Sequence, residues 1–125
     1  MIKVSSGTKW EDIVGYSRAV RVGNMVFVAG TTAVDGLVVI GANNVYEQTR
    51  FIIQKIEKAL QQCNATLDNV VQTRMYVTNI SQWEQVAKAH REFFDNIRPA
   101  ATMVEVNALA MPELLIEIEV IAIIN

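Results

Sequence analysis

The hydrophobic and polar positions along the chain predict strands and helices in mixed order. Residues 17–32 contain two β-rich runs joined at Gly23-Asn24, which predicts a β-hairpin. The second run, residues 25–29, is apolar on both faces, so we expect a buried strand. Asp35-Gly36 indicates a turn, and residues 37–40 (LVVI) then predict a short strand.

Residues 45–63 have apolar side chains at three- and four-residue spacing, which is typical of an amphipathic helix. Asn43 or Asn44 would cap it. The apolar stripe consists of Ile52, Ile56, Ala59, Leu60 and Cys63. No histidine or second cysteine lies near Cys63 in the sequence, so we interpret this cysteine as a small buried hydrophobic residue.

A second helix is predicted to begin at Ser81 and to extend to about Phe94. Ser81 with Glu84 three residues later fits a capping box. The predicted apolar stripe consists of Trp83, Val86, Ala87, His90 and Phe94. Because His90 lies on that stripe, a locally hydrogen-bonded core or interface histidine is the favoured interpretation, with a role in a site as the alternative.

Two longer segments predict central strands. In residues 70–79, one face carries Val71, Thr73, Met75 and Val77, and the other carries Gln72, Arg74 and Tyr76. In residues 114–124, one face is fully apolar, and the other, with Leu115, Glu117, Glu119, Ile121 and Ile123, is mostly so. A half-exposed strand should have a polar second face. We therefore expect helices on one face and another subunit on the other.

The resulting order is β-β-β-α-β-α-β-β. It predicts an α+β fold in one domain, residues 1–125, with one mixed sheet and two helices on one face. A second sheet face rich in valine and isoleucine predicts a closed homo-oligomer.

Composition narrows the class of partner. The chain is 51% hydrophobic with a net charge of −2, and its pI is about 5.4. Without a basic run, we expect neither nucleic acid nor a membrane surface as a partner. The single cysteine excludes an internal disulfide and fits a reducing compartment, so we expect a cytoplasmic protein. One histidine and one cysteine also argue against a transition-metal site.

The candidate chemistry lies in carboxylates and arginines, because no nucleotide-binding or hydrolase motif is present. Glu117 and Glu119 share one strand face, about 7 Å apart, and could serve as acid and base or as interface ion pairs. Arg18, Arg74 and Arg98 each lie in or beside a predicted strand. Any of them could bind a carboxylate, or could instead be solvated or paired with an acid.

Three segments resemble the RidA/YjgF family: GYSRAVRVGNMVFVAGTT, VVQTRMYVTNISQWEQVAKAHREFF and RPAATMVEV with LLIEIEVIA. The resemblance covers nearly the whole chain in order. It implies a chorismate-mutase-like fold and a homotrimer with a central barrel and clefts between subunits. In active members these clefts hydrolyse enamines and imines such as 2-aminoacrylate, to a 2-keto acid and ammonia, without a metal or an organic cofactor.

The resemblance also implies site residues. Glu117 matches the glutamate that activates water, Tyr16 matches a cleft tyrosine, and Gly30, followed by Thr31, matches the glycine of a Ser-Gly pair. The family's arginine after Pro-Ala, which binds the substrate carboxylate, is replaced by Ala101. Thr102 follows it, and Met103 stands where many members carry cysteine.

Loss of the arginine predicts weak or absent hydrolysis of ordinary 2-imino acids. Arg98, Arg18 or Arg74 would reach the cleft from another direction, or the cleft would bind an uncharged or cationic ligand. The sequence thus favours a divergent enamine/imine deaminase with altered specificity. The alternative is a non-catalytic, ligand-binding or regulatory trimer. An RNA-acting protein is argued against by the acidic pI.

Overall fold

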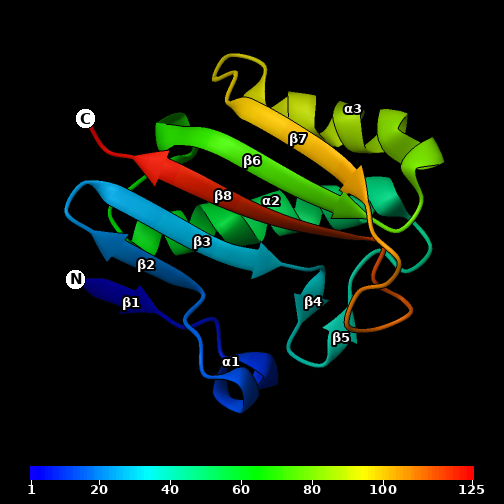
Figure 1. The fold of residues 1–125 in the computed structure, drawn as a ribbon, viewed down its shortest axis with the longest axis horizontal. Helices are drawn as coiled ribbons and strands as arrows, with labels where there is room; N and C mark the ends of the chain where they lie inside the picture. Colours follow the sequence, from blue (N-terminus) through cyan, green and yellow to red (C-terminus); the bar gives the residue numbers. More distant parts are fainter.

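The computed structural model describes all residues, 1–125, as one six-stranded mixed sheet with helices on one side (Figure 1). The strands of this sheet are β1 (Ile2–Val4), β2 (Ala19–Val22), β3 (Met25–Thr31), β6 (Val70–Val77), β7 (Ala100–Glu105) and β8 (Ile116–Ile123). The helices are α1 (Lys9–Val14), α2 (Val45–Gln62) and α3 (Trp83–Phe94). The α+β class with two long helices on one face is confirmed.

The strands lie in the order β1-β2-β3-β8-β6-β7, so the last strand of the chain is central. Strand β8 is antiparallel to both neighbours, and β6 and β7 form the parallel pair that α3 connects. Helices α2 and α3 pack side by side on the far face in Figure 1. The near face, which we call the open face, carries no helix.

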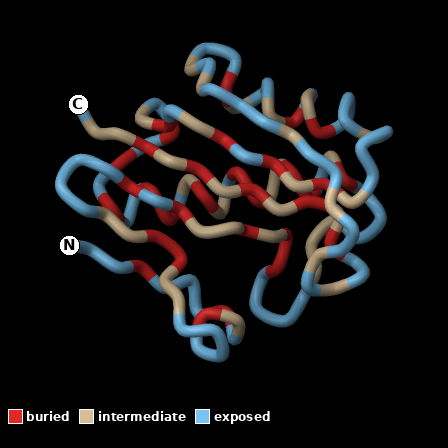
Figure 2. Tube along the Cα trace, in the orientation of Figure 1, coloured by how far each residue is buried: buried red, intermediate tan, exposed pale blue.

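The core lies between the sheet and the two long helices (Figure 2). Strand β8 alternates between buried and half-buried residues along its length, as its two faces predict. On α2, the predicted stripe from Ile52 to Cys63 is buried. Asn44, rather than Asn43, caps this helix by accepting a hydrogen bond from the Glu47 backbone N–H.

Strand β6 departs from the predicted alternation at its first residues. The register against β8 shifts between Val70 and Gln72, which is a β-bulge. Val70 is therefore buried, and Val71 is 43% exposed. Our assignment of Val71 to the buried face is wrong, because one extra residue in the strand reverses which side chain points inward. Thr73, Met75 and Val77 are buried as predicted.

The start of α3 also differs from the prediction. Ser81 is not the cap: residues 80–82 form a 3-10 turn, η2 (Ile80–Gln82), and the Asn79 side chain accepts hydrogen bonds from the Ser81 backbone N–H and hydroxyl. Trp83 is 52% exposed and lies off the buried stripe, which is centred on Val86, Ala89 and Phe94. Trp83 is the first residue of α3, so its side chain lies at the end of the helix, where it is exposed to solvent.

The N-terminal region contains two elements that the pattern did not predict, β1 and α1. Strand β1 pairs with β2, and the six-residue α1 ends at Gly15, which adopts the left-handed conformation. The predicted strand at residues 37–40 is reduced to β5 (Val38–Val39), which pairs with β4 (Val34–Asp35) in a separate two-stranded ribbon. No helix in the structure is both long and apolar enough to cross a membrane.

Candidate functional site

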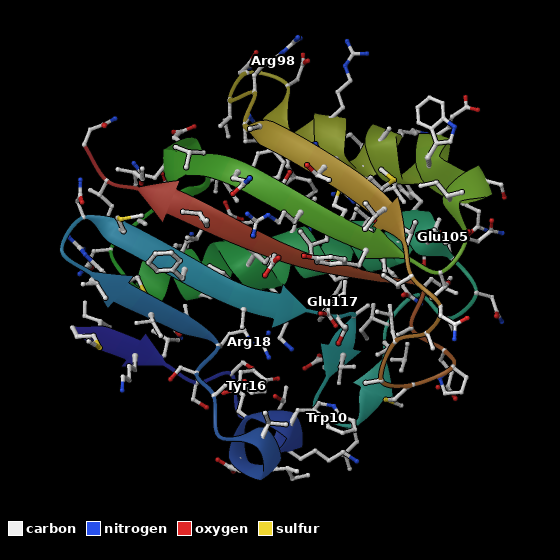
Figure 3. All side chains as sticks on the ribbon, in the orientation of Figure 1. Trp10, Tyr16, Arg18, Arg98, Glu105 and Glu117 are labelled. Atoms are coloured by element: carbon white, nitrogen blue, oxygen red, sulfur yellow. The ribbon has the colours of Figure 1, made fainter.

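Tyr16, Arg18 and Glu117 converge where β3 ends, beside α1 (Figure 3). Glu117 comes from β8, and the other two come from the segment between α1 and β2. Gly30 and Thr31, the last two residues of β3, lie beside them. The structure therefore brings together the residues around Glu117 that the resemblance implicates, within a single chain.

Gly30 allows Glu117 to lie directly on the backbone of β3. A Cβ built on Gly30 would overlap Oε2 of Glu117 and would lie 2.9 Å from its carboxyl carbon. The β3–β8 register shifts between Val28 and Thr31, so the regular pairing of the two strands is interrupted at this point. A residue without a side chain is required here because the carboxyl group occupies the space.

The pKa of Glu117 is raised. Burial is the main cause, since it disfavours the charged carboxylate, and Glu119 on the same strand face adds repulsion. The positive charge of Arg18 opposes both effects without cancelling them. Glu117 makes no ion pair. An unpaired carboxyl group with a shifted pKa is a frequent feature of functional sites.

Arg18 is 4% exposed and is held on several sides. Its Nη1 donates to the Gly30 carbonyl (2.6 Å) and to Thr31 Oγ1 (3.0 Å), and its Nη2 donates to the Tyr16 hydroxyl (3.0 Å). Its Nε donates to Glu11 Oε2 at 3.4 Å. A guanidinium has five N–H groups, so one, on Nη2, has no partner within the chain.

Glu11 is the buried counter-ion of Arg18, and the sequence analysis missed it. Burial alone would raise its pKa, but hydrogen bonds from Ser6, Ser5 and Thr8 outweigh burial and lower the pKa to about 2. Glu11 is therefore ionised at neutral pH. The sequence did not indicate which acid pairs with Arg18. A helix of six residues is too short for its sequence pattern to show which of its acids points inward.

A cavity of about 190 Å³ opens beside these groups. Its lining includes Trp10, Tyr16, Arg18, Gly30, Lys55 and Glu117. We call it the Glu117 cavity. Lys55 was not singled out from the sequence, although it lies three residues after Ile52 and four before Ala59, at the edge of the apolar stripe of α2. A lysine at the edge of an apolar stripe usually packs its stem on the core and keeps its charge in water, so the sequence carried no signal for this residue.

Arg74 lies on the open face and not in the Glu117 cavity. Its Nη1 is 3.6 Å from Glu119 Oε1, and the Tyr76 hydroxyl donates a short hydrogen bond to the same carboxylate. The side chains of Arg74 and Glu119 are 47% and 34% exposed. Glu119 thus has an ion-pair partner within its own chain, and an ion pair across a subunit interface stays a prediction.

The strand that carries Ala101 is the far edge of the sheet. Ala101 pairs with Thr73 and Met103 with Met75, so these two β7 residues belong to the helix-covered face, whereas Thr102 pairs with Arg74 on the open face. Ala101 and Thr102 are exposed, and Met103 packs against the core. Within one chain, these residues are separate from the Glu117 cavity.

Arg98 precedes this strand in a turn and points away from Glu117 in Figure 3. Its side chain is 76% exposed and donates to the Asp95 side chain at 3.0 Å and to the Asp95 carbonyl at 2.8 Å. Its φ is +55°, which explains the sharp entry into β7. No intrachain contact brings Arg98 to the site.

The two remaining candidate residues, His90 and Cys63, have surroundings typical of residues with a structural role. His90 Nε2 lies 3.0 Å from Thr73 Oγ1, and burial lowers the pKa of the imidazole. Cys63 is buried and unpaired, as predicted, and burial raises the pKa of its thiol. No cluster of three or more His, Cys, Asp or Glu side chains is arranged to hold a metal ion.

Comparison with known proteins identifies the family. The family model described as endoribonuclease L-PSP matches residues 7–124. The chain belongs to the RidA/YjgF family. The crystal structure of Rv2704 from Mycobacterium tuberculosis, a member of the YjgF/YER057c/UK114 family, is 49% identical, with a TM-score of 0.91 over 98% of both chains.

Two curated relatives extend the family match. The RutC family protein PYRAB12510 from Pyrococcus abyssi is 36% identical over 86% of this chain and 84% of its own. The uncharacterized protein SCO2049 from Streptomyces coelicolor is 34% identical over 94% of this chain and 88% of its own. Membership of the RidA/YjgF family and its α+β fold, expected from the sequence, are thus confirmed.

Proposed function

We propose that this RidA/YjgF-family chain forms a homotrimer in which the open sheet faces pack into a central barrel. The open face of β3 and β8 supports the proposal, since it carries Phe27, which is 42% exposed, and the half-buried Ile121 and Ile123. Burial of such a face against other copies is favourable because apolar surface leaves water. The Glu117 cavity then becomes part of a cleft for a small metabolite between subunits.

Within this cleft we assign to Glu117 the activation of water for hydrolysis of an enamine or imine. The observation that carries this assignment is an unpaired carboxyl of raised pKa that lines a cavity. The carboxylate takes a proton from water as the water oxygen adds to the imine carbon. The proton then passes to the nitrogen, which gives a carbinolamine. Transfer of the hydroxyl proton to the amino group accompanies cleavage of the carbon–nitrogen bond, so that ammonia and a carbonyl product leave.

Several other candidate residues have binding roles in this proposal. Tyr16 lines the Glu117 cavity with Gly30, whose backbone gives the ligand close access. Thr31 is fully buried and does not line the cavity, so its hydroxyl acts on the site only by accepting a hydrogen bond from Arg18.

Thr102 on β7 and Arg74 on β6, which lie on the open face, would contribute from a neighbouring subunit. Met103 packs against the core and Arg98 is bonded to Asp95, so neither has a binding role in this proposal. Alanine at position 101 offers no donor for a carboxylate, so specificity differs from that of arginine-bearing members.

The alternative function is a non-catalytic trimer that binds or senses a small molecule. The observation in its favour is Ala101, because the loss of a charge-assisted hydrogen bond weakens binding by about one to two powers of ten. In that case Glu117 would be an acid of the subunit interface. In either case we propose a cytoplasmic location, which the single buried cysteine supports.

The test is the hydrolysis of freshly generated 2-iminopropionate, measured against buffer and an arginine-bearing family member. Because Ala101 offers no donor, we expect wild-type protein to accelerate loss of the imine less than the arginine-bearing member does, and we expect Glu117→Gln to abolish the acceleration. Glu119→Gln is the matched control, since Glu119 is the same residue type on the same strand face and should retain activity. No acceleration by wild type, or equal rates for Glu117→Gln, would favour the binding trimer.

A further inference from the structure

Lys55 is a partly buried cation without an anionic partner in the structure. It extends from α2 to the region where β3 and β4 meet, and its Nζ donates to the Val34 carbonyl at 2.9 Å. An ammonium has three N–H donors, so two are not used by this bond. Lys55 forms no ion pair, unlike Arg18, Arg74 and Arg98.

The two cations of the Glu117 cavity differ in their partners. Arg18 has an ion-pair partner in Glu11, whereas Lys55 has none. Asp35 also acts on Lys55, but it is exposed in a turn and does not line this cavity. Lys55 therefore presents a cation at the cavity wall without a direct anionic partner, which is costly for a partly buried charge.

We propose that Lys55 binds the acid group of an anionic ligand in the Glu117 cavity, and that it replaces the missing arginine of position 101. This inference rests on the proposed function and specifies which residue of this chain would bind the acid group of its substrate. The ligand carboxylate would accept hydrogen bonds from the free N–H donors of Lys55 and give this cation an anionic partner. The free Nη2–H of Arg18 lines the same cavity and adds a donor.

The geometry favours Lys55 over the arginines of the open face and edge. Lys55 and Glu117 line one cavity of about 190 Å³, which holds roughly six water volumes of about 30 Å³ each. A small keto or imino acid fits such a space, with its acid at Lys55 and its reacting carbon at Glu117. Arg74 is already paired with Glu119, and Arg98 with Asp95.

The lowered pKa of Lys55 agrees with this assignment. Burial is the main cause, and the neighbouring Arg18 adds to it. A bound carboxylate would offset both effects, because it favours the charged ammonium. Ligand binding is thus expected to be coupled to the charge of Lys55.

The test compares pyruvate with pyruvamide by isothermal titration calorimetry on the intact protein. The two probes have nearly the same shape, and only pyruvate carries the carboxylate. We expect wild type to bind pyruvate more tightly than pyruvamide, and Lys55→Met to weaken pyruvate binding about tenfold to a hundredfold without affecting pyruvamide. Lys55→Arg should retain most of the preference.

Lys58→Met is the matched control, because Lys58 lies one turn further along α2, is exposed and does not line the Glu117 cavity. It should bind both probes as wild type does. Equal affinities of wild type for the two probes, no binding of pyruvate, or an unchanged preference in Lys55→Met would overturn the inference.

Failure of this inference can be distinguished from failure of the proposed function. Turnover of 2-iminopropionate that depends on Glu117 but not on Lys55 would leave the hydrolase intact and remove Lys55 as the anion-binding residue. Lys55-dependent binding of pyruvate without any turnover would retain the anion site and reject the hydrolase.

Discussion

Two regions hold the residues that the RidA/YjgF resemblance implicates, and they are built differently. Around the end of β3, Arg18, Glu11 and Gly30 contact one another or Glu117 and are shielded from water. At the edge strand β7, Ala101 and Thr102 are exposed, and Arg98 bonds only to its own turn. Polar groups in the first region depend on each other, whereas a substitution in the second leaves the chain's own packing intact.

This difference explains why position 101 can lose an arginine without damage to the fold. A buried guanidinium that loses its partners leaves several polar groups unsatisfied. An exposed side chain on an edge strand leaves none. Specificity can therefore change at β7, while the region around Glu117 is constrained by its own hydrogen bonds.

The largest expected effect is in the first region, from Glu11→Gln. The pKa of Glu11 is lowered from 4.5 to about 2, so its stabilisation is fully present above pH 4.5 and is lost as the pH falls toward 2. The substitution should lower the free energy of unfolding at pH 7 by up to about 3 kcal/mol. Urea unfolding at fixed protein concentration measures this loss, which should shrink steadily below pH 4.

Asp12→Asn is the control for this prediction, since Asp12 is the neighbouring exposed acid of α1. It should change stability by less than about 0.5 kcal/mol. Equal effects of the two substitutions at every pH would mean that the hydrogen bonds to ionised Glu11 do not stabilise the fold.

Gly30→Ala tests the close contact between β3 and Glu117. The added Cβ would overlap Oε2 of Glu117, so the carboxyl must move or the strand must shift. We expect a loss of about 1–3 kcal/mol in unfolding free energy. In the double variant with Glu117→Ala, which removes the overlapping atoms, most of this loss should be recovered. Strict additivity of the two single effects would show that the contact does not exist.

These first-region residues also mark the limit of what the sequence could predict. The periodicity of apolar residues was sufficient to predict α2, α3 and the central strands, because each of these long elements repeats its pattern several times. It failed at Val71, where one bulge residue reverses the faces, and at α1, which is too short to repeat. The burial of Glu11 depends on hydroxyl groups that surround it only in the folded chain.

The candidate site was predicted in part for a similar reason. Glu117, Tyr16 and Gly30 came from the family resemblance, and the structure brings them together. The choice among Arg18, Arg74 and Arg98 could not be made from the sequence, because each arginine's partner is distant in the chain or depends on a turn. Lys55 was overlooked, since a lysine on an amphipathic helix is usually solvated.

Glu117→Gln should have a smaller effect on stability, of opposite sign to that of Glu11→Gln. Burial raises the pKa of Glu117, so the ionised carboxylate is destabilising above its folded-state pKa, and this penalty is absent below the unfolded value of about 4.3. The variant should therefore melt at a higher temperature than wild type at pH 8, and the difference should vanish near pH 4. A lower melting temperature at pH 8 would contradict an unpaired, buried carboxylate.

Arg98→Ala is expected to have the smallest effect and tests the second region. Alanine keeps the Cβ, so the backbone strain at a φ of +55° is unchanged, and only the exposed ion pair with Asp95 is lost. Unfolding free energy should stay within about 0.5 kcal/mol of wild type, and hydrolysis of 2-iminopropionate within about twofold. A large loss of hydrolysis with normal stability would show that Arg98 of one subunit enters the cleft of another. The anion-binding role would then move from Lys55 in the first region to the edge strand, next to the position that lost the family's arginine.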